Sequence, residues 1–182
     1  MDNKGRPEPL TDEQLRAVTV GELGPLDGSI PLAPYNADWP RMYATLERQI
    51  RVALGAQVLL LLEHVGSTSV PGLLAKPTID MVMAVPDSAD EGAYVAPLEC
   101  TGFVLRIREP DWFEHRLLKS PGIDGNLHVF SRACAEIDRM LAFRDWLRPN
   151  DDDRMLYQRT STSWRRVNGS TSRITPTQNR PR

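Results

Sequence analysis

The sequence from Glu63 to Val85 reads EHVGSTSVPGLLAKPTIDMVMAV, and this stretch decides the fold. Apolar runs over residues 58–65 and 77–85 predict two buried strands. The loop between them starts at Gly66 and is rich in hydroxyl side chains. Glycine lets a backbone approach a ligand closely, and the hydroxyl and N–H groups that follow can bind an anion. A short helix after the loop would add its dipole.

Two charged residues follow this loop. Lys76 places a positive charge beside it, and Asp80 interrupts an otherwise apolar strand. A carboxylate in such a strand is costly unless it is paired or binds a metal ion. The combination predicts a site for phosphate and a divalent cation. The alternative is that the loop is an ordinary turn and that Asp80 pairs with Lys76 or Arg116.

Periodicity and turn residues predict the remaining elements. They are helices over 11–18, 38–54, 88–102 and 135–147, a helix from 151 to at least 157, an edge strand over 30–35, and strands over 103–107, 112–119 and 127–130. In the helix over 38–54, the apolar residues recur at helical spacing and should form one buried face, namely Trp39, Met42, Tyr43, Leu46, Ile50 and Leu54. Strands and helices mix without strict βαβ alternation, which predicts an α+β domain with a mixed sheet flanked by helices.

The chain divides into three segments. Residues 1–28 are expected to be an N-terminal tail and linker with a short helix, and residues 29–160 one domain. Residues 161–182 are rich in Ser, Thr and Arg and lack helical periodicity, so we expect a disordered tail. A second hypothesis is that this tail results from a frameshift after Thr160, because restoring one base there can encode a helix-forming sequence. Reading the coding DNA in the neighbouring frame decides between them.

Composition excludes several classes of protein. The net charge of −2 provides no global basic field for nucleic acid, although it leaves a local basic patch open. The two cysteines, Cys100 and Cys134, are far apart and lack metal-ligand spacing. The sequence contains no apolar run of about 20 residues, so we expect no membrane span. The N-terminus has no apolar signal segment, so we expect a cytoplasmic protein.

Four motifs together resemble the GrpB family. They are the run from His64 to Asp80, YNADWP at residues 35–40, NLHVF at 126–130, and LAFRDWLR at 141–148. The resemblance covers residues 11–160 in order. By fold the family belongs to the nucleotidyltransferase superfamily. In that superfamily a Gly-Ser turn holds the nucleotide triphosphate, and the next strand carries an Asp-x-Asp pair that binds Mg²⁺.

The resemblance implies roles for individual residues. Gly66 and Ser67 correspond to the phosphate turn, and Asp80 to the first metal-binding and catalytic carboxylate. Thr68, Lys76 and Arg116 are further candidates for phosphate contacts. For Arg116 the alternatives are a carboxylate partner such as Asp80 and a solvated side chain.

The sequence departs from the pattern at the second carboxylate, which is Val82. Glu63 or His128 could supply a replacement ligand. Since imidazole is a poorer ligand for Mg²⁺ than a carboxylate, a site for a softer metal or no metal also remains open. The alternative for His128 is a histidine at the core edge that is bonded to backbone.

Two functions follow as hypotheses. The first is binding of a nucleoside triphosphate with Mg²⁺ and transfer of a nucleotidyl or phosphoryl group to an acceptor. The second is a non-catalytic nucleotide-binding or interaction module, which Val82 favours. GrpB-like domains also occur fused to dephospho-CoA kinase, and this association suggests an accessory role in coenzyme A biosynthesis.

Overall fold

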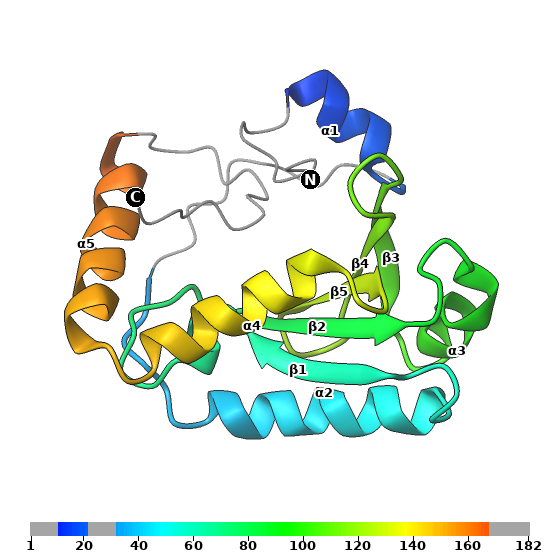
Figure 1. Ribbon diagram of the computed structural model, residues 1–182, viewed down its shortest axis with the longest axis horizontal. Helices are drawn as coiled ribbons and strands as arrows, with labels where there is room; N and C mark the ends of the chain where they lie inside the picture. The colour runs from blue at the N-terminus through cyan, green and yellow to red at the C-terminus, as the bar shows by residue number, and fades with distance from the viewer. Residues whose placement is uncertain (1–10, 22–31, 168–182) are drawn as a thin grey trace.

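The computed structural model describes residues 11–21 and 32–167 (Figure 1). The strands are β1 (Leu61–Val65), β2 (Ile79–Val85), β3 (Val104–Glu109), β4 (His115–Lys119) and β5 (Gly125–Ser131). The α-helices are α1 (Asp12–Val18), α2 (Trp39–Ala53), α3 (Val95–Glu99), α4 (Ala135–Leu147) and α5 (Asp151–Val167). Two short 3₁₀ helices, η1 (Ser67–Ser69) and η2 (Glu91–Ala93), complete these elements.

The five strands form one mixed sheet in the order β1-β2-β5-β4-β3. β2 and β5 run parallel, and every other neighbouring pair is antiparallel. The parallel pair requires a long crossover, and the chain between β2 and β5 supplies it with α3 and the β3–β4 hairpin. This arrangement confirms the predicted α+β class and the mixed sheet flanked by helices.

Helices cover both faces of the sheet, as Figure 1 shows for α2 on one side and α4 on the other. Side chains alternate along β2, so Met81 and Met83 point to the α2 face, while Val82 and Ala84 point to the α4 face. Asp80 shares the face of Val82 and therefore lies on the α4 side. Both faces hold a buried apolar core, and α5 packs against α4.

α2 confirms the face predicted from helical spacing. Its buried members are Trp39, Leu46, Ile50 and Leu54, and Met42 and Tyr43 are partly buried beside them. Asp38 occupies the N-cap position, but its side chain makes no capping hydrogen bond and pairs with Arg41 instead. Pro40 lies in the first turn, where backbone N–H groups have no partner within the helix, so its missing N–H costs no hydrogen bond.

Three elements differ from their predictions. The helix over 88–102 is broken into η2 and α3, since Gly92 and Pro97 are both poor helix formers. β4 starts only at His115, because Phe113 and Glu114 have positive φ in the preceding turn. The edge strand over 30–35 reduces to a single bridge between Ala33 and Ala75, and residues 30 and 31 lie outside the described residues.

The C-terminal helix runs well past Tyr157, the minimum extent predicted for it. α5 continues to Val167, so the expected boundary at residue 160 falls inside a helix. The remainder of the predicted tail, residues 168–182, lies outside the described residues. Within residues 11–21 and 32–167, no helix combines the length and the apolar character that crossing a membrane requires.

Candidate functional site

The loop after β1 folds back onto the Asp80 carboxylate. Val65 pairs with Asp80 across the antiparallel β1–β2 ladder, so the loop begins directly beside it. Gly66 has φ 74° and ψ −161°, a conformation that side chains disfavour. A Cβ on Gly66 would lie 2.6 Å from Asp80 Oδ2 and 3.0 Å from Asp80 Cβ. Only glycine therefore allows this approach, which brings together the predicted phosphate turn and the predicted carboxylate.

Asp80 is held by polar partners on its own face of the sheet. Asn126, its partner on the parallel strand β5, donates from Nδ2 to Asp80 Oδ1 at 2.7 Å. Burial raises the pKa of Asp80 to about 6, and the hydrogen bond from Asn126 and the charges of Lys119 and Lys76 oppose this rise. Asp80 therefore titrates close to neutrality, which is common for groups in functional sites.

A second carboxylate lies close by but is already engaged. Asp124 accepts from Thr78 Oγ1 at 2.6 Å and from Lys119 Nζ at 2.9 Å. Burial would raise the pKa of Asp124, but these two hydrogen bonds hold it below its usual value. We refer to Asp80, Asn126, Asp124, Thr78 and Lys119 as the Asp80 cluster.

The three loop hydroxyls have different surroundings. Ser67 Oγ lies 3.5 Å from the hydroxyl of Tyr157 on α5, and Ser69 donates to Gly66 O at 2.7 Å. Thr68 is 1% exposed, donates to Thr78 O at 3.1 Å and lies 3.0 Å from His64 Nε2. Its hydroxyl ties the loop to the sheet, and the phosphate contact of Thr68 stays a prediction.

Arg116, a further predicted phosphate contact, lies away from the loop and from Asp80. Arg116 pairs with Val129 in the β4–β5 ladder, and Val129 belongs to the core beneath α2, so the arginine lies on the face opposite Asp80. Its guanidinium donates to Glu91 at 2.6 Å and to Glu114 at 3.2 Å. Arg116 is therefore a buried ion-pair partner that cannot reach the Asp80 cluster.

The predicted metal ligands do not assemble into a metal centre. Val82 is fully buried, and its partners in the two neighbouring ladders are Glu63 and His128. Glu63 accepts from Arg144 at 2.8 Å, and His128 Nδ1 lies 3.0 Å from His115 Nε2. In the described part of the chain, no group of three or more His, Cys, Asp or Glu side chains is placed to hold a metal ion. The residues present do not fit a two-metal site.

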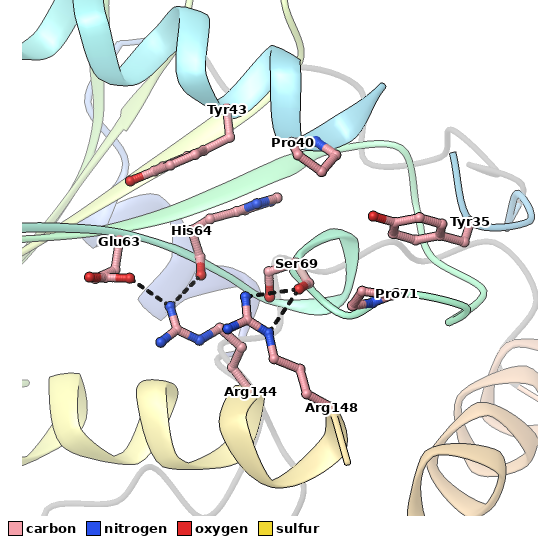
Figure 2. A pocket seen from close by; sticks show the side chains of 9 residues that line it. All are labelled: Tyr35, Pro40, Tyr43, Glu63, His64, Ser69, Pro71, Arg144 and Arg148. Carbon is pink, nitrogen blue, oxygen red and sulfur yellow. Dashed lines mark hydrogen bonds and ion pairs between the residues drawn. The ribbon is translucent and has the colours of Figure 1, made fainter. Parts of the chain in front are cut away.

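A separate pocket of about 340 Å³ lies outside the edge strand β1, between α2 and α4 (Figure 2). Its lining residues are Tyr35, Pro40, Tyr43, Glu63, His64, Ser69, Pro71, Arg144 and Arg148. The rings of Tyr43 and His64 stack with centroids 4.9 Å apart. Burial, with the charges of Arg148 and Arg144, lowers the pKa of His64 to about 4, so this ring is neutral at pH 7.

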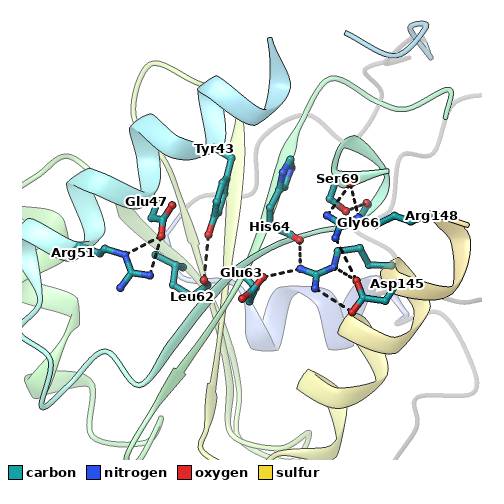
Figure 3. Close-up of polar contacts among 11 residues, drawn as sticks. Tyr43, Glu47, Arg51, Leu62, Glu63, His64, Gly66, Ser69, Asp145 and Arg148 are labelled. Atoms are coloured by element: carbon teal, nitrogen blue, oxygen red, sulfur yellow. Dashed lines mark hydrogen bonds and ion pairs between the residues drawn. The ribbon is translucent and has the colours of Figure 1, made fainter. Parts of the chain in front are cut away.

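Arg144 of α4 and Arg148, the residue that follows this helix, form the polar wall of the pocket (Figure 2). Figure 3 shows Arg148 beside Ser69 and Asp145. Arg144 donates to Glu63 at 2.8 Å, to His64 O at 2.9 Å and to Asp145 at 2.8 Å. Arg148 donates to Ser69 O at 3.2 Å and to Asp145 at 3.4 Å. Both guanidinium groups are thus already bound to carboxylates and backbone oxygens, and the pocket is not a preformed anion site.

Sequence reasoning missed Arg144 because the charges of residues 138–148 indicate a solvated helix face. The sequence does contain a pattern that indicates burial of Arg144, since this residue falls in the apolar stripe of Ile137, Met140 and Leu147. A charged residue inside such a stripe is buried and needs partners. Arg144 satisfies a backbone oxygen at the free edge of β1, because its guanidinium donates to His64 O. The Tyr43 hydroxyl does the same for Leu62 O, at 3.1 Å. Unpaired edge groups would otherwise be open to another chain.

Substitution of Arg144 by leucine should lower the free energy of unfolding by about 1–3 kcal/mol, because His64 O loses its donor and Glu63 its cation. Chemical denaturation checks this value. Arg139→Leu is the matched control, since Arg139 pairs within α4 with Glu136. An equal decrease in the free energy of unfolding in the two variants would contradict a special role of Arg144 at the edge of β1.

Comparison with known proteins identifies the family. The sequence profile of the family described as GrpB protein matches residues 29–173. The chain belongs to the GrpB family.

GrpB relatives resemble this chain over most of its length. The UPF0157 protein BH1888 of Halalkalibacterium halodurans is 54% identical over 172 residues, which cover 92% of this chain and 88% of the relative. The UPF0157 protein SCO7215 of Streptomyces coelicolor is 47% identical over 143 residues, which cover 78% of this chain and 74% of the relative. The crystal structure of the conserved protein GrpB from Enterococcus faecalis matches with a TM-score of 0.68 and 26% identity, covering 79% of this chain and 88% of that one.

Proposed function

We propose that this chain binds a nucleoside triphosphate at the Gly66–Ser67 turn beside the Asp80 cluster. The observation that carries the proposal is the packing of Gly66 against the Asp80 carboxylate, within range of the charges of Lys76 and Lys119. A glycine turn lets phosphate oxygens approach backbone N–H groups, and lysines nearby offset their charge. The proposed placement in the nucleotidyltransferase superfamily rests on the same loop and strand.

We favour nucleotide binding alone over nucleotidyl or phosphoryl transfer by a two-metal mechanism. Val82 has no ligand atom, Glu63 is held by Arg144, and Asp124 is held by Thr78 and Lys119. Two-metal transfer needs several carboxylates on one site to clamp the attacking and leaving oxygens. The chain therefore acts as a nucleotide-binding module, and an accessory role in coenzyme A biosynthesis remains a prediction.

Calorimetric titration with ATP tests this function, with Mg²⁺ present and with a chelator. We expect ATP to bind in both conditions. Lys76→Gln should weaken binding by about three- to tenfold, because one favourable charge near the phosphates is lost. Arg48→Gln removes an equal charge from the exposed side of α2 and should leave the affinity unchanged.

Asp80→Ala separates the two hypotheses. Without a metal, an ionised carboxylate repels the phosphates, so its removal should preserve or strengthen ATP binding. Binding that requires Mg²⁺ and disappears in Asp80→Ala would instead support metal-dependent nucleotidyl or phosphoryl transfer. Asp111→Ala, in the exposed turn before β4, controls for the general loss of a carboxylate. The absence of any heat with ATP would contradict nucleotide binding itself.

A further inference from the structure

The pocket outside β1 is lined by a histidine that has one ring nitrogen without a partner. His64 is 8% exposed, and its Nε2 lies 3.0 Å from Thr68 Oγ1. Its other ring nitrogen, Nδ1, makes no hydrogen bond within the described part of the chain. Among the described residues, Gln49 Oε1 is the one fully buried side-chain polar atom without a partner, so Nδ1 of His64 keeps contact with solvent. Because His64 lines the pocket, we place Nδ1 at the pocket surface.

The hydrogen bonds of Thr68 decide which ring nitrogen of His64 carries the proton. The Thr68 hydroxyl donates its proton to Thr78 O at 3.1 Å, since a carbonyl can only accept. The same oxygen must therefore accept from His64 Nε2–H. A histidine with an ordinary pKa is already mostly neutral at pH 7.5, and burial with the charges of Arg148 and Arg144 lowers the pKa of His64 further, to about 4. Nδ1 is thus an unprotonated acceptor.

The charges around the pocket cancel one another. Arg144 pairs with Glu63 and with Asp145, and Arg148 pairs with Asp145. Two guanidinium groups are therefore balanced by two carboxylates, and His64 adds no charge. An anionic ligand would have to compete with these carboxylates for the arginines. The pocket consequently favours a neutral ligand.

Arg148 can still donate to such a ligand. Its Nε and Nη2 donate to Ser69 O, and its Nη1 donates to Asp145. A guanidinium has more N–H groups than these contacts use, and the side chain of Arg148 is 42% exposed. The pocket therefore offers an acceptor at His64 Nδ1 and N–H donors at Arg148, both of which line it (Figure 2).

The remaining walls suit a flat ring. Tyr35, Pro40 and Pro71 contribute ring carbons to the lining. The volume of about 340 Å³ lies at the lower end of the range of small-molecule sites, which is roughly 300–1,000 Å³. A small planar molecule with an apolar body and one polar end matches these dimensions.

We propose that the pocket outside β1 binds a small, neutral, flat molecule with a carboxamide or lactam group, whose N–H donates to His64 Nδ1 and whose carbonyl accepts from Arg148. An amide fits because it combines one donor and one acceptor without a net charge. No residue of the Asp80 cluster lines this pocket, so the site is separate from the proposed nucleotide site. The inference therefore does not depend on ATP binding.

Three probes of equal size test the ligand class at pH 7.5, with backbone amide NMR as the readout. Benzamide has both the N–H donor and the carbonyl. Acetophenone has a methyl group in place of the NH₂ group, and benzoate lacks the donor and is negatively charged. We expect benzamide to shift the amide signals of Tyr35, Ser69 and Arg148 in a saturable way and to leave those of Asn126 and Lys119 in place. Acetophenone and benzoate should bind about five- to tenfold more weakly, because His64 Nδ1 then has no donor.

Three results of this series would overturn the proposal. Benzamide that causes no saturable shift at the pocket would contradict the site itself. Acetophenone that binds as tightly as benzamide would show that apolar contact alone drives binding. Benzoate that binds more tightly than benzamide would show that the arginines form an anion site.

Nitrogen-15 NMR of the histidine rings tests the contact with His64 directly, because the chain has only three histidines. We expect the free His64 ring to carry its proton on Nε2 and none on Nδ1. Benzamide should shift the Nδ1 signal, whereas acetophenone should leave it unchanged. A free ring that is protonated on Nδ1, or an Nδ1 signal that does not respond while benzamide binds, would contradict the proposed hydrogen bond.

Two variants separate the donor from the acceptor. His64→Phe keeps a ring beside Tyr43 and should lower the affinity for benzamide to that for acetophenone, while acetophenone binds as before. Equal weakening of both ligands would contradict the role of Nδ1. Arg148→Leu should weaken both ligands about three- to tenfold, since both have a carbonyl, and Arg139→Leu, outside the pocket, is its matched control. Wild-type affinity in Arg148→Leu would contradict the carbonyl contact. The probe series on the wild type decides whether or not these variants fold.

Discussion

Substitution of Gly66 by alanine should lower the free energy of unfolding by about 2–5 kcal/mol, one of the two largest effects we expect. Two causes add. The φ of 74° and ψ of −161° strain any residue with a Cβ, and that Cβ would meet Asp80 Oδ2 at 2.6 Å. The loop must then move away from Asp80, so ATP binding should weaken as well.

A matched glycine separates the two causes. Gly72 also has positive φ, at 78°, but the nearest atom to an added Cβ is Arg154 Nε at 4.0 Å. Gly72→Ala should therefore show the backbone strain alone. In an Asp80→Ala background, Gly66→Ala should cost less, because the contact with Oδ2 is gone. Chemical denaturation of these variants measures each step. Equal losses for Gly66→Ala and Gly72→Ala would show that the loop does not press on Asp80.

Substitution of Asp80 by asparagine should stabilise the protein above pH 6, by up to about 3 kcal/mol. The pKa of Asp80 rises from 3.8 to about 6 on folding, mainly through burial. The folded chain therefore binds more protons than the unfolded chain between these two values. The stability of the wild type falls as pH rises through this window, and the full penalty remains above it. Asparagine carries no charge and can still accept the hydrogen bond from Asn126.

Thermal or chemical unfolding from pH 4 to pH 8 measures this effect. The difference between Asp80→Asn and wild type should be largest at pH 8 and should vanish towards pH 4. His64 and His128 have lowered pKa values, so they destabilise the fold below about pH 6.5. Their contribution is common to both proteins and cancels in the difference. Asp111→Asn is the exposed control. A stability difference that does not depend on pH would contradict the raised pKa of Asp80.

Much of the fold was predictable because the patterns that encode it are local. Helical spacing identified the buried face of α2, and the capping sequence Thr11 to Gln14 identified α1, whose capping box is present. Apolar runs with turn residues between them located the strands. A glycine at a strand end and a carboxylate in an apolar strand singled out Gly66 and Asp80, and the structure packs the two residues against each other.

Other features depend on registers between distant strands, which no local pattern reveals. The face of Arg116 is set by the pairing of β4 with β5, and this pairing directs it away from Asp80. The burial of Thr68 depends on its bond to Thr78 across the loop. Likewise, His128 meets His115 only because β5 and β4 are neighbours. The sequence identifies these residues by chemical type, whereas the partners that they have in the fold depend on how the strands pair.

The most direct test of the central claim is an NMR titration of the backbone amides with ATP in the presence of a chelator. We expect the amide signals of Gly66, Ser67 and Asp80 to shift in a saturable way, while those of Tyr35 and Arg148 in the pocket outside β1 stay in place. Shifts confined to that pocket, or no saturable shift anywhere, would contradict nucleotide binding at the Gly66–Asp80 junction.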